Sequence, residues 1–291
     1  MEAGFSMIHS ISIRTCRRLL SSALLLFALT GCMMGNFSDN LSRAILDQND
    51  PQIVHDGAPA YLLLIDSFVA GDPHDVDMLR AGATLYATYA AVFAEDEQRA
   101  RSLADRAWSY GRRAWCEEAG FACGMEKKNF DEFQRVLKRV KARHLETFYA
   151  YTVSWMVRIK ADAGNWGALA DLPKVEAALS RIVEIDESYQ QGGAHLYLGI
   201  LNALRPPSLG GRPEVGRDHF ERALQLSGGK DLSVRVEYAR TYARLVYDRE
   251  LHDRLLREVL EGEAQVPGLV LKNTLAKRDA IRLLDSGDDY F

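Results

Sequence analysis

Proline and cysteine are scarce in this sequence, and neither sign of charge dominates it. Its 291 residues include eight Pro and four Cys, and 36 Lys and Arg stand against 40 Asp and Glu, for a net charge of −4. A β-sandwich or barrel needs a turn signal about every 8–12 residues, which eight Pro and 22 Gly do not supply. Without a basic excess the chain has no general attraction to nucleic acid. The 47% hydrophobic and 26% charged content is that of a globular protein and excludes collagen-like and disordered chains.

Sequence patterns of enzymes and metal sites are also missing. The His residues stand singly, without an HExxH motif or a pair at i, i+4. Ser227-Gly228-Gly229-Lys230 follows a predicted helix and lacks the first Gly and the final Ser or Thr of a phosphate loop. His195 and His219 flank one loop, where bracing the fold is the expected role and catalysis or ligation the alternative. We therefore expect no enzymatic activity, no metal and no cofactor.

The amino terminus has the layout of a bacterial export signal. Arg14, Arg17 and Arg18 precede an uncharged apolar run of eleven residues, 19–29. Such a run rises only about 16 Å as a helix, too short for a bilayer core of roughly 30 Å. The following Leu29-Thr30-Gly31-Cys32 resembles the bacterial lipobox. The pattern predicts a cleaved lipoprotein signal peptide at 1–31, lipid attachment at Cys32 and a lipidated tether at 32–37. A plain secretory peptide with an incidental Cys is the alternative.

Cleavage at this point changes the charge and the predicted location. Residues 1–31 contain three Arg and one Glu, so their removal takes the net charge from −4 to −6. One acyl chain binds a membrane only marginally, whereas the three chains of a mature bacterial lipoprotein anchor it stably. Met33 follows Cys32, and by resemblance to Gram-negative sorting rules the lack of Asp there favours the outer membrane over the inner. We expect a periplasmic protein that is anchored to the membrane by lipid.

Two Cys remain in the predicted mature body, Cys116 and Cys123. Residues seven apart in a continuous helix lie about 10.5 Å apart, beyond the roughly 7 Å limit between the Cα atoms of a disulfide. Gly120 and Gly124 can end the helix and turn the chain back, which permits a bridge in an oxidising compartment. The spacing is not that of a CxxC redox pair.

Apolar residues recur at helical spacing through almost the whole of residues 38–291. One run is Leu79, Gly82, Ala83, Tyr86 and Ala90, and similar stripes continue to the carboxyl end. Strict alternation is nowhere sustained, and Pro or Gly separates the stripes, as at Pro173, Pro213 and Gly228. The pattern predicts an all-α fold of antiparallel helix pairs in one domain.

The best evidence for a repeat lies in residues 194–226. Helix pairs that each bury one face against the next are the design of tetratricopeptide (TPR) repeats, whose period is near 34 residues. Positions typical of the TPR motif are occupied by Leu198, Gly199, Gly216, Phe220 and Ala223. Small residues at such positions let helices approach closely. The sequence therefore predicts helix pairs stacked as a TPR-like solenoid.

Aromatic residues are the one lead to a ligand. Phe148, Tyr151 and Trp155 share one face of a predicted helix, and Tyr89 lies on another. A superhelix of helix pairs has a concave side, and aromatic residues there would suit an apolar ligand or an extended peptide. Ordinary core packing is the alternative.

A family resemblance rests on motifs in residues 192–226 and on shorter matches on both sides. The sequence resembles the T component associated with TRAP transporters, the TatT family of periplasmic TPR-containing lipoproteins. The resemblance covers roughly residues 30–287. The motifs are Gly193-Ala194-His195, Arg205-Pro206-Pro207, Gly210-Gly211-x-Pro213-Glu214, His219-Phe220-x-x-Ala223, Asn165-Trp166, Leu172-Pro173-Lys174-Val175, Val236-Glu237-Tyr238-Ala239-Arg240 and Leu271-Lys272-Asn273-x-x-Ala276.

The resemblance implies a homotrimer that associates with the periplasmic solute-binding (P) subunit of a TRAP transporter. It also implies that small organic acids or hydrophobic ligands are bound or passed on. Cys32 carries over as the lipid site. The loop residues Arg205, Pro206, Gly210, Gly211, Pro213 and Glu214 are interpreted as structural, because Pro rigidifies, Gly allows a tight turn and Glu214 favours the helix dipole. The second hypothesis is an envelope scaffold that organises protein complexes without a small-molecule ligand.

Overall fold

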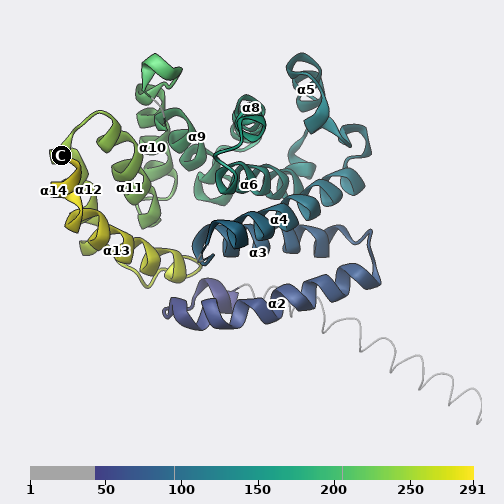
Figure 1. Cartoon of the computed structure of the whole chain (residues 1–291), viewed down its shortest axis with the longest axis horizontal. Coiled ribbons are helices and arrows are strands. Elements are labelled where there is room, and N and C mark those ends of the chain that lie inside the picture. Colours follow the sequence, from purple (N-terminus) through teal and green to yellow (C-terminus); the bar gives the residue numbers. More distant parts are fainter. Residues whose placement is uncertain (1–42, 95, 205) are drawn as a thin grey trace, which may run out of the picture.

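Helices form the regular secondary structure of residues 43–94, 96–204 and 206–291, which are the residues that the computed structural model describes (Figure 1). No strand occurs in these three segments. The predicted all-α class is therefore confirmed. Cys32 and Arg205 lie outside the described residues.

The α-helices follow one another with short connections. They are α2 (Pro51–Gly71), α3 (Val76–Val92), α4 (Glu97–Glu118), α5 (Phe130–Leu137), α6 (Leu145–Ala161), α7 (Trp166–Leu169), α8 (Leu172–Ile185), α9 (Gly193–Ala203), α10 (Pro213–Leu226), α11 (Leu232–Tyr238), α12 (Arg249–Glu261), α13 (Val270–Asp285) and α14 (Gly287–Tyr290). Short 3-10 turns are η1 (Gly120–Ala122), η2 (Met125–Lys127), η3 (Ala142–His144), η4 (Tyr189–Gln191) and η5 (Pro207–Leu209), and a π-helical turn, η6 (Ala239–Ala243), follows α11.

Local sequence explains where the helices begin and end. Asp50, Asp75 and Asp96 precede α2, α3 and α4, and each carboxylate accepts a hydrogen bond from an N–H of the first turn. Pro213 occupies the first turn of α10, where a missing N–H costs nothing. Gly228 ends α10 with a φ of +58°, a conformation that favours glycine.

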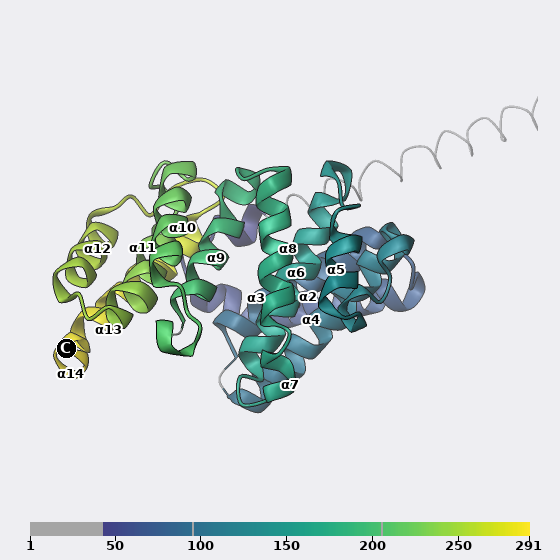
Figure 2. The ribbon, with the colours of Figure 1, turned by 90° about the horizontal axis from the view of Figure 1, so that it is seen from above.

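Neighbouring helices approach closely at small residues. A Cβ on Gly82 of α3 would lie 2.6 Å from the Tyr110 ring of α4. On α10, a Cβ on Gly216 would lie 2.9 Å from the backbone oxygen of Gly199 in α9. Seen from above, α8, α9 and α10 lie in succession along the molecule (Figure 2). Glycine therefore sets the helix spacing at the pair that the sequence identified as TPR-like.

The helical path curves back on itself. Leu271 of α13 is buried in the same apolar cluster as Leu62 of α2 and Leu79 of α3 (Figure 1). The backbone N–H of Gly268 donates to Asp47 Oδ1 at 2.5 Å. Asn273 of α13 is fully buried. Its side-chain oxygen accepts a hydrogen bond from the N–H of Leu232, and its side-chain nitrogen donates to the carbonyl of Lys230. Helix α13, near the carboxyl end, is thus in contact with α2, which a straight stack of helix pairs would not bring about.

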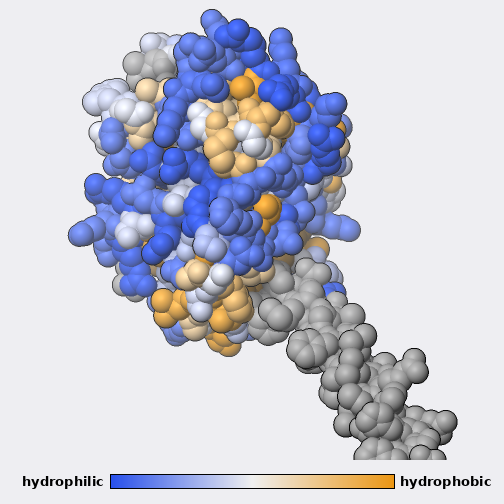
Figure 3. All heavy atoms as spheres, turned by 90° about the vertical axis from the view of Figure 1, so that its right-hand side faces the viewer, coloured by the Kyte–Doolittle hydropathy of each residue, from blue (hydrophilic) through white to orange (hydrophobic). Residues whose placement is uncertain are grey.

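An exposed apolar face runs along α2. Val54, Ala58 and Leu62 face inward and are buried, whereas Leu63 is 70% exposed. Figure 3 shows apolar surface at the lower edge of the molecule, where α2 lies. The other exposed large apolar residues of this helix are Ile53, Leu64 and Phe68. Among the described helices, α2 is long and apolar enough to cross a membrane, but its inner face packs on α3. We therefore describe it as part of the helical body.

Cys116 and Cys123 are joined by a disulfide in the structure. Their Cα atoms lie 4.3 Å apart because α4 ends at Glu118 and η1 turns the chain back. Gly124 follows with a φ of +72°. The bridge ties the end of α4 to the short turns that lead to α5.

Two histidines connect α9 and α10. The Nδ1 atoms of His195 and His219 lie 2.9 Å apart, and His195 Nε2 lies 3.5 Å from a Glu187 carboxylate oxygen. Burial lowers the pKa of both rings, that of His219 to about 4. The facing Arg212 and Arg222 lower these pKa values further, and Asp218 and Glu187 oppose the shift. The geometry places the two rings as a brace beside the loop that they flank.

We predict that Gly216→Ala destabilises the protein by about 1–3 kcal/mol, because the added methyl group forces α9 and α10 apart. Urea unfolding followed by circular dichroism measures the change. Gly57→Ala in α2 is the matched control, since its Cβ would meet nothing within 4 Å, and we expect it to stabilise the protein by about 0.5–1 kcal/mol. Equal effects of the two substitutions would contradict the close approach.

We predict that the histidine pair makes stability depend on pH. The folded-state pKa of His219 lies below the usual value near 6.5, so the unfolded chain binds more protons between about pH 6.5 and 4. The contribution of His219 to the free energy of unfolding is therefore fully present above pH 6.5. It is lost as the pH falls from 6.5 toward 4. Urea unfolding at a series of pH values should show a shallower fall for His219→Gln. An unchanged fall would rule out this contribution.

Candidate functional site

The four aromatic residues proposed for ligand binding lie inside the packed core. Phe148, Tyr151 and Trp155 are 0% exposed and Tyr89 is 2% exposed. Phe148 packs on Trp115, and Tyr89 packs among α2, α3 and α4 with its hydroxyl donating to the His55 carbonyl. Their helices bury these faces against one another, so none of the four rings lines an open concave surface. Trp155 nevertheless lines a pocket that is described below, and Tyr151 packs behind it.

The loop between α9 and α10 is held by contacts within the chain. Gly210 has a φ of +79°, and the N–H of Gly211 donates to the Pro206 carbonyl at 3.1 Å. Arg212 forms an ion pair with Glu176 of α8. Glu214 accepts a hydrogen bond from Tyr242 at 3.1 Å in the first turn of α10, directly after Pro213. These contacts fit the loop to neighbouring helices and leave its described side chains with structural partners.

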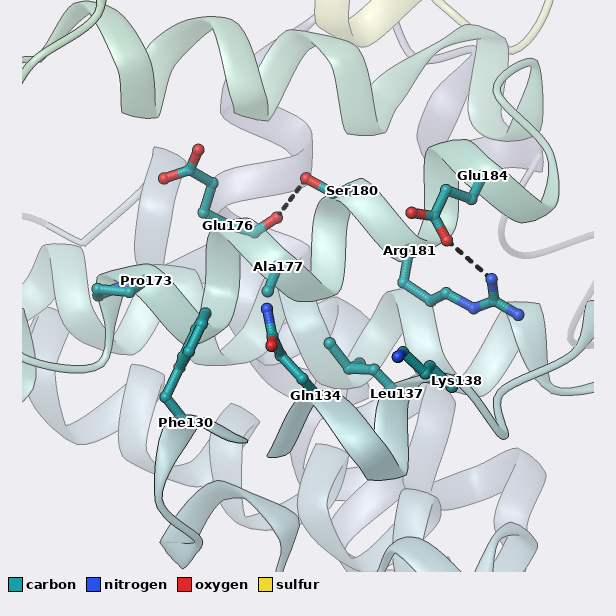
Figure 4. A pocket seen from close by; sticks show the side chains of 10 residues that line it. All are labelled: Phe130, Gln134, Leu137, Lys138, Pro173, Glu176, Ala177, Ser180, Arg181 and Glu184. Atoms are coloured by element: carbon teal, nitrogen blue, oxygen red, sulfur yellow. Dashed lines mark hydrogen bonds and ion pairs between the residues drawn. The ribbon is translucent and has the colours of Figure 1, made fainter. Parts of the chain in front are cut away.

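A groove of about 550 Å³ separates α5 from α8 (Figure 4). Leu137 and Ala177 are the apolar residues between the two helices, and Phe130, 40% exposed, stands at one end. Ser180 donates to the Glu176 carbonyl, and Arg181 pairs with Glu184. Gln134, Lys138 and Pro173 also line the groove. The result is an apolar floor with a polar rim.

A second pocket, of about 400 Å³, lies where α4, α6, η2 and the start of α8 meet. Trp108 of α4 and Trp155 of α6 are stacked beside it, with ring centroids 5.0 Å apart and an angle of 23° between the planes. Tyr151 packs against both rings at 5.1 and 5.7 Å. The other lining residues are Asp105, Ser109, Arg112, Glu126, Lys127, Arg158 and Asp171. We call this the tryptophan pocket.

Charges on the rim of the tryptophan pocket balance. The cationic residues are Arg112, Lys127 and Arg158, and the carboxylates are Asp105, Glu126 and Asp171. Arg158 pairs with Asp105 at 2.7 Å, whereas Arg112 reaches Glu126 only at 3.5 Å. The Arg112 guanidinium also lies 5.7 Å from the centre of the Trp108 ring. The rim thus offers both signs of charge above an aromatic floor.

Two buried polar atoms beside the tryptophan pocket have no hydrogen-bond partner, the Tyr151 hydroxyl and Arg112 Nε. Burial raises the pKa of Tyr151 well above its usual value, and the nearby Glu126 and Asp171 carboxylates raise it further. The hydroxyl therefore stays protonated and is a hydrogen-bond donor without an acceptor. Arg112 Nε–H is another such donor. Unpartnered buried atoms of this kind also occur away from the pocket, at Thr147, Arg181 and Arg244, so they do not by themselves mark a binding site.

By contrast, a polar cluster at the junction of α6, α9 and α13 is internally paired. The Tyr149 and Tyr197 phenols share a hydrogen bond, and burial raises the pKa of both. Lys272 Nζ donates to Asp231 Oδ2 at 2.9 Å. These contacts brace the helices at this junction. Within the described residues no group of three or more His, Cys, Asp or Glu side chains could hold a metal ion.

Sequence reasoning missed Trp108, Arg112 and Glu126 as members of one site. Trp108 and Arg112 are four residues apart on α4, and Tyr151 and Trp155 are four apart on α6. The available signal in the sequence was Arg112, a polar residue at the edge of an apolar stripe and one helical turn from Trp108. The contact between these edges of α4 and α6 is a tertiary contact, and helical spacing does not reveal it.

Comparison with known proteins identifies the family. No curated protein matches this chain. The family model described as TRAP transporter T-component matches residues 47–291, which is more than half of the sequence. The match includes the tryptophan pocket, the α5–α8 groove and the loop between α9 and α10. The chain therefore belongs to the TRAP transporter T-component family.

Proposed function

We propose that this protein is a periplasmic TRAP transporter component that binds a small organic ligand and associates with the solute-binding (P) subunit. It acts without catalysis, as a homotrimer held by lipid on Cys32 to the periplasmic face of the outer membrane. Family membership supports the transporter association. The basic, apolar and lipobox segments ahead of Cys32 support the anchor.

The tryptophan pocket carries the ligand-binding part of the proposal. Its volume of about 400 Å³ lies within the range of small-molecule sites, which pair an apolar lining with a few placed polar groups. The observation that carries it is the stacked pair of Trp108 and Trp155 at the floor of a pocket whose rim holds charged groups of both signs.

Two apolar surfaces support the protein contacts in the proposal. The α5–α8 groove, with Phe130 at its end and a polar rim, has the anatomy of a protein interface and suits the solute-binding subunit. The outer face of α2, with Ile53, Leu63, Leu64 and Phe68 exposed, suits contact between copies of the chain. Both surfaces lie within the matched family region.

We predict that the full chain carries lipid on Cys32. Expressed in a Gram-negative host, it should fractionate with membranes, and mass spectrometry of the amino-terminal peptide should show three acyl chains. Cys32→Ala should abolish the modification and leave the protein out of the mature membrane pool. A mature amino terminus at another residue without lipid would instead support a plain secretory peptide.

We predict that a co-encoded solute-binding subunit is captured by the tagged protein in a crosslinking pull-down. Phe130→Ser should weaken the capture several-fold, because Phe130 is the large exposed apolar group of the α5–α8 groove. Val246→Ser, at an exposed apolar residue outside the groove, is the matched control. Capture of other envelope proteins but of no solute-binding subunit would favour the scaffold hypothesis.

A further inference from the structure

We propose that residues 135–143, which run from the last turn of α5 into η3, are a docking segment for an acidic protein surface. We call these residues the basic segment. The acidic surface belongs to the partner that enters the α5–α8 groove, which in the proposed function is the solute-binding subunit. The inference rests on that function and names the chemistry of the partner's contact surface. It follows from the charge of the segment, its lack of carboxylate partners and its place beside the groove.

The basic segment carries a concentration of positive charge that the chain as a whole lacks. Its nine residues include five cations and no Asp or Glu, whereas the whole chain has a net charge of −4. The five are Arg135, Lys138, Arg139, Lys141 and Arg143, and all are exposed. Their spacings of one to three residues do not exceed the screening length of about 10 Å in 0.1 M salt, so these charges repel one another. The segment is thus a positive patch on an acidic protein.

Carboxylates of the fold do not neutralise this patch. Within the described residues, none of the five cations forms an ion pair with Asp or Glu. Glu146, in the first turn of the adjoining α6, contacts Arg80 of α3 instead, at 3.2 Å. Arg139 lies over the Phe121 ring at 4.2 Å, a contact that positions the guanidinium without cancelling its charge. The positive charge therefore remains available to a partner.

Helix stability explains only part of this charge. Arg135 lies in the last turn of α5 and Lys138 follows it, where the negative end of the helix dipole favours cations. Lys141 and Arg143 instead precede the first turn of α6, where the positive end of the dipole disfavours them. Arg143 Nε donates to His144 Nε2 at 3.0 Å, which satisfies the ring but gives the cation no carboxylate. The helix dipoles therefore give no reason for the last two cations.

The basic segment borders one end of the α5–α8 groove. Lys138 lines the groove at the end where Arg181 and Glu184 lie, whereas Phe130 stands at the other end (Figure 4). Arg181 donates to the Val140 carbonyl at 2.7 Å, which ties the segment to α8. Because Arg181 and Glu184 pair with each other at 2.8 Å, Lys138 adds an unmatched positive charge at this end. A protein that places an apolar residue beside Phe130 meets these cations with its neighbouring surface, and acidic side chains complement them there.

The place of the segment in the molecule favours a protein over a membrane as its partner. The predicted tether precedes α2, which lies along the lower edge of the molecule in Figure 1, whereas α5 lies at the upper edge. A chain that is anchored through Cys32 therefore presents the basic segment away from the point where the tether joins the helical body. Binding to anionic lipid is an outcome of the test below.

The test measures binding of the purified co-encoded solute-binding subunit to the full chain in detergent by biolayer interferometry, in about 0.05 M and about 0.3 M salt. The double variant Lys138→Glu/Lys141→Glu should weaken binding about tenfold or more at the lower salt, mainly through slower association, because the reversed charges repel an acidic surface. Higher salt should weaken the unaltered complex more than that of the variant. Lys138→Arg/Lys141→Arg keeps both charges and should keep the affinity.

Arg254→Glu/Arg278→Glu is the matched control. These residues of α12 and α13 are exposed and form no ion pair with the described part of the chain, and their reversal changes the net charge by the same amount. We expect this variant to bind the subunit as the unaltered chain does. An equal loss of affinity in both Glu variants would show an effect of net charge alone and would overturn the docking segment.

The outcomes separate this inference from the proposed function. Unchanged affinity of Lys138→Glu/Lys141→Glu would overturn the basic segment and leave the transporter association standing. Failure of the unaltered chain to bind the subunit would instead overturn the association itself. The full chain anchored in phosphatidylcholine liposomes is also mixed with phosphatidylglycerol vesicles. If it captures these vesicles and the Lys-to-Glu variant does not, while both bind the subunit equally, the segment binds anionic lipid and the protein surface is overturned.

Discussion

The packing of α4 against α6 through Trp108, Tyr151 and Trp155 is the contact on which the rest of the molecule depends. The three ring centroids lie 5.0–5.7 Å from one another. Trp155 also touches Phe133 of α5, and the same cluster contains Leu179 of α8. Aromatic rings bury large areas and prefer a few geometries, so they fix the helix positions closely. Trp108 and Trp155 of this cluster also form the floor of the tryptophan pocket. The pocket floor is therefore held in place by core contacts.

Two further features hold the helices in place along the rest of the chain. Helices approach closely at glycine residues, and α13 returns to the amino-terminal helices. Gly199 and Gly216 let α9 and α10 pack at backbone distance, and the histidine pair braces the same two helices. The carboxyl-terminal α13 returns to the amino-terminal helices through Leu271, and the Asn273 amide connects it to the start of α11. A path whose ends are joined resists bending more than an open stack, in which each unit contacts only its neighbours.

The sequence predicts the helices well because local forces decide them. Apolar spacing, Asp caps and Pro213 agree with the observed helix limits, and Gly120 and Gly124 mark the turn that brings Cys116 and Cys123 together. It predicts the site poorly. An aromatic stripe such as Phe148, Tyr151 and Trp155 looks the same whether it faces a core or a concave surface, since the facing element is not encoded in the stripe. The return of Leu271 to α2 is likewise a contact between residues far apart in sequence, for which periodicity carries no signal.

The start of α8 connects the two surfaces to which the proposed function is assigned. Asp171 lines the tryptophan pocket, whereas Pro173 and Glu176, less than two turns further on, line the α5–α8 groove. Between them Lys174 donates to the Glu126 carbonyl at 2.7 Å and contacts Asp171 at 3.3 Å. Lys174 therefore ties the start of α8 to η2 at the edge of the tryptophan pocket. The tryptophan pocket and the α5–α8 groove, on which the proposed ligand and partner contacts depend, therefore meet at the start of α8.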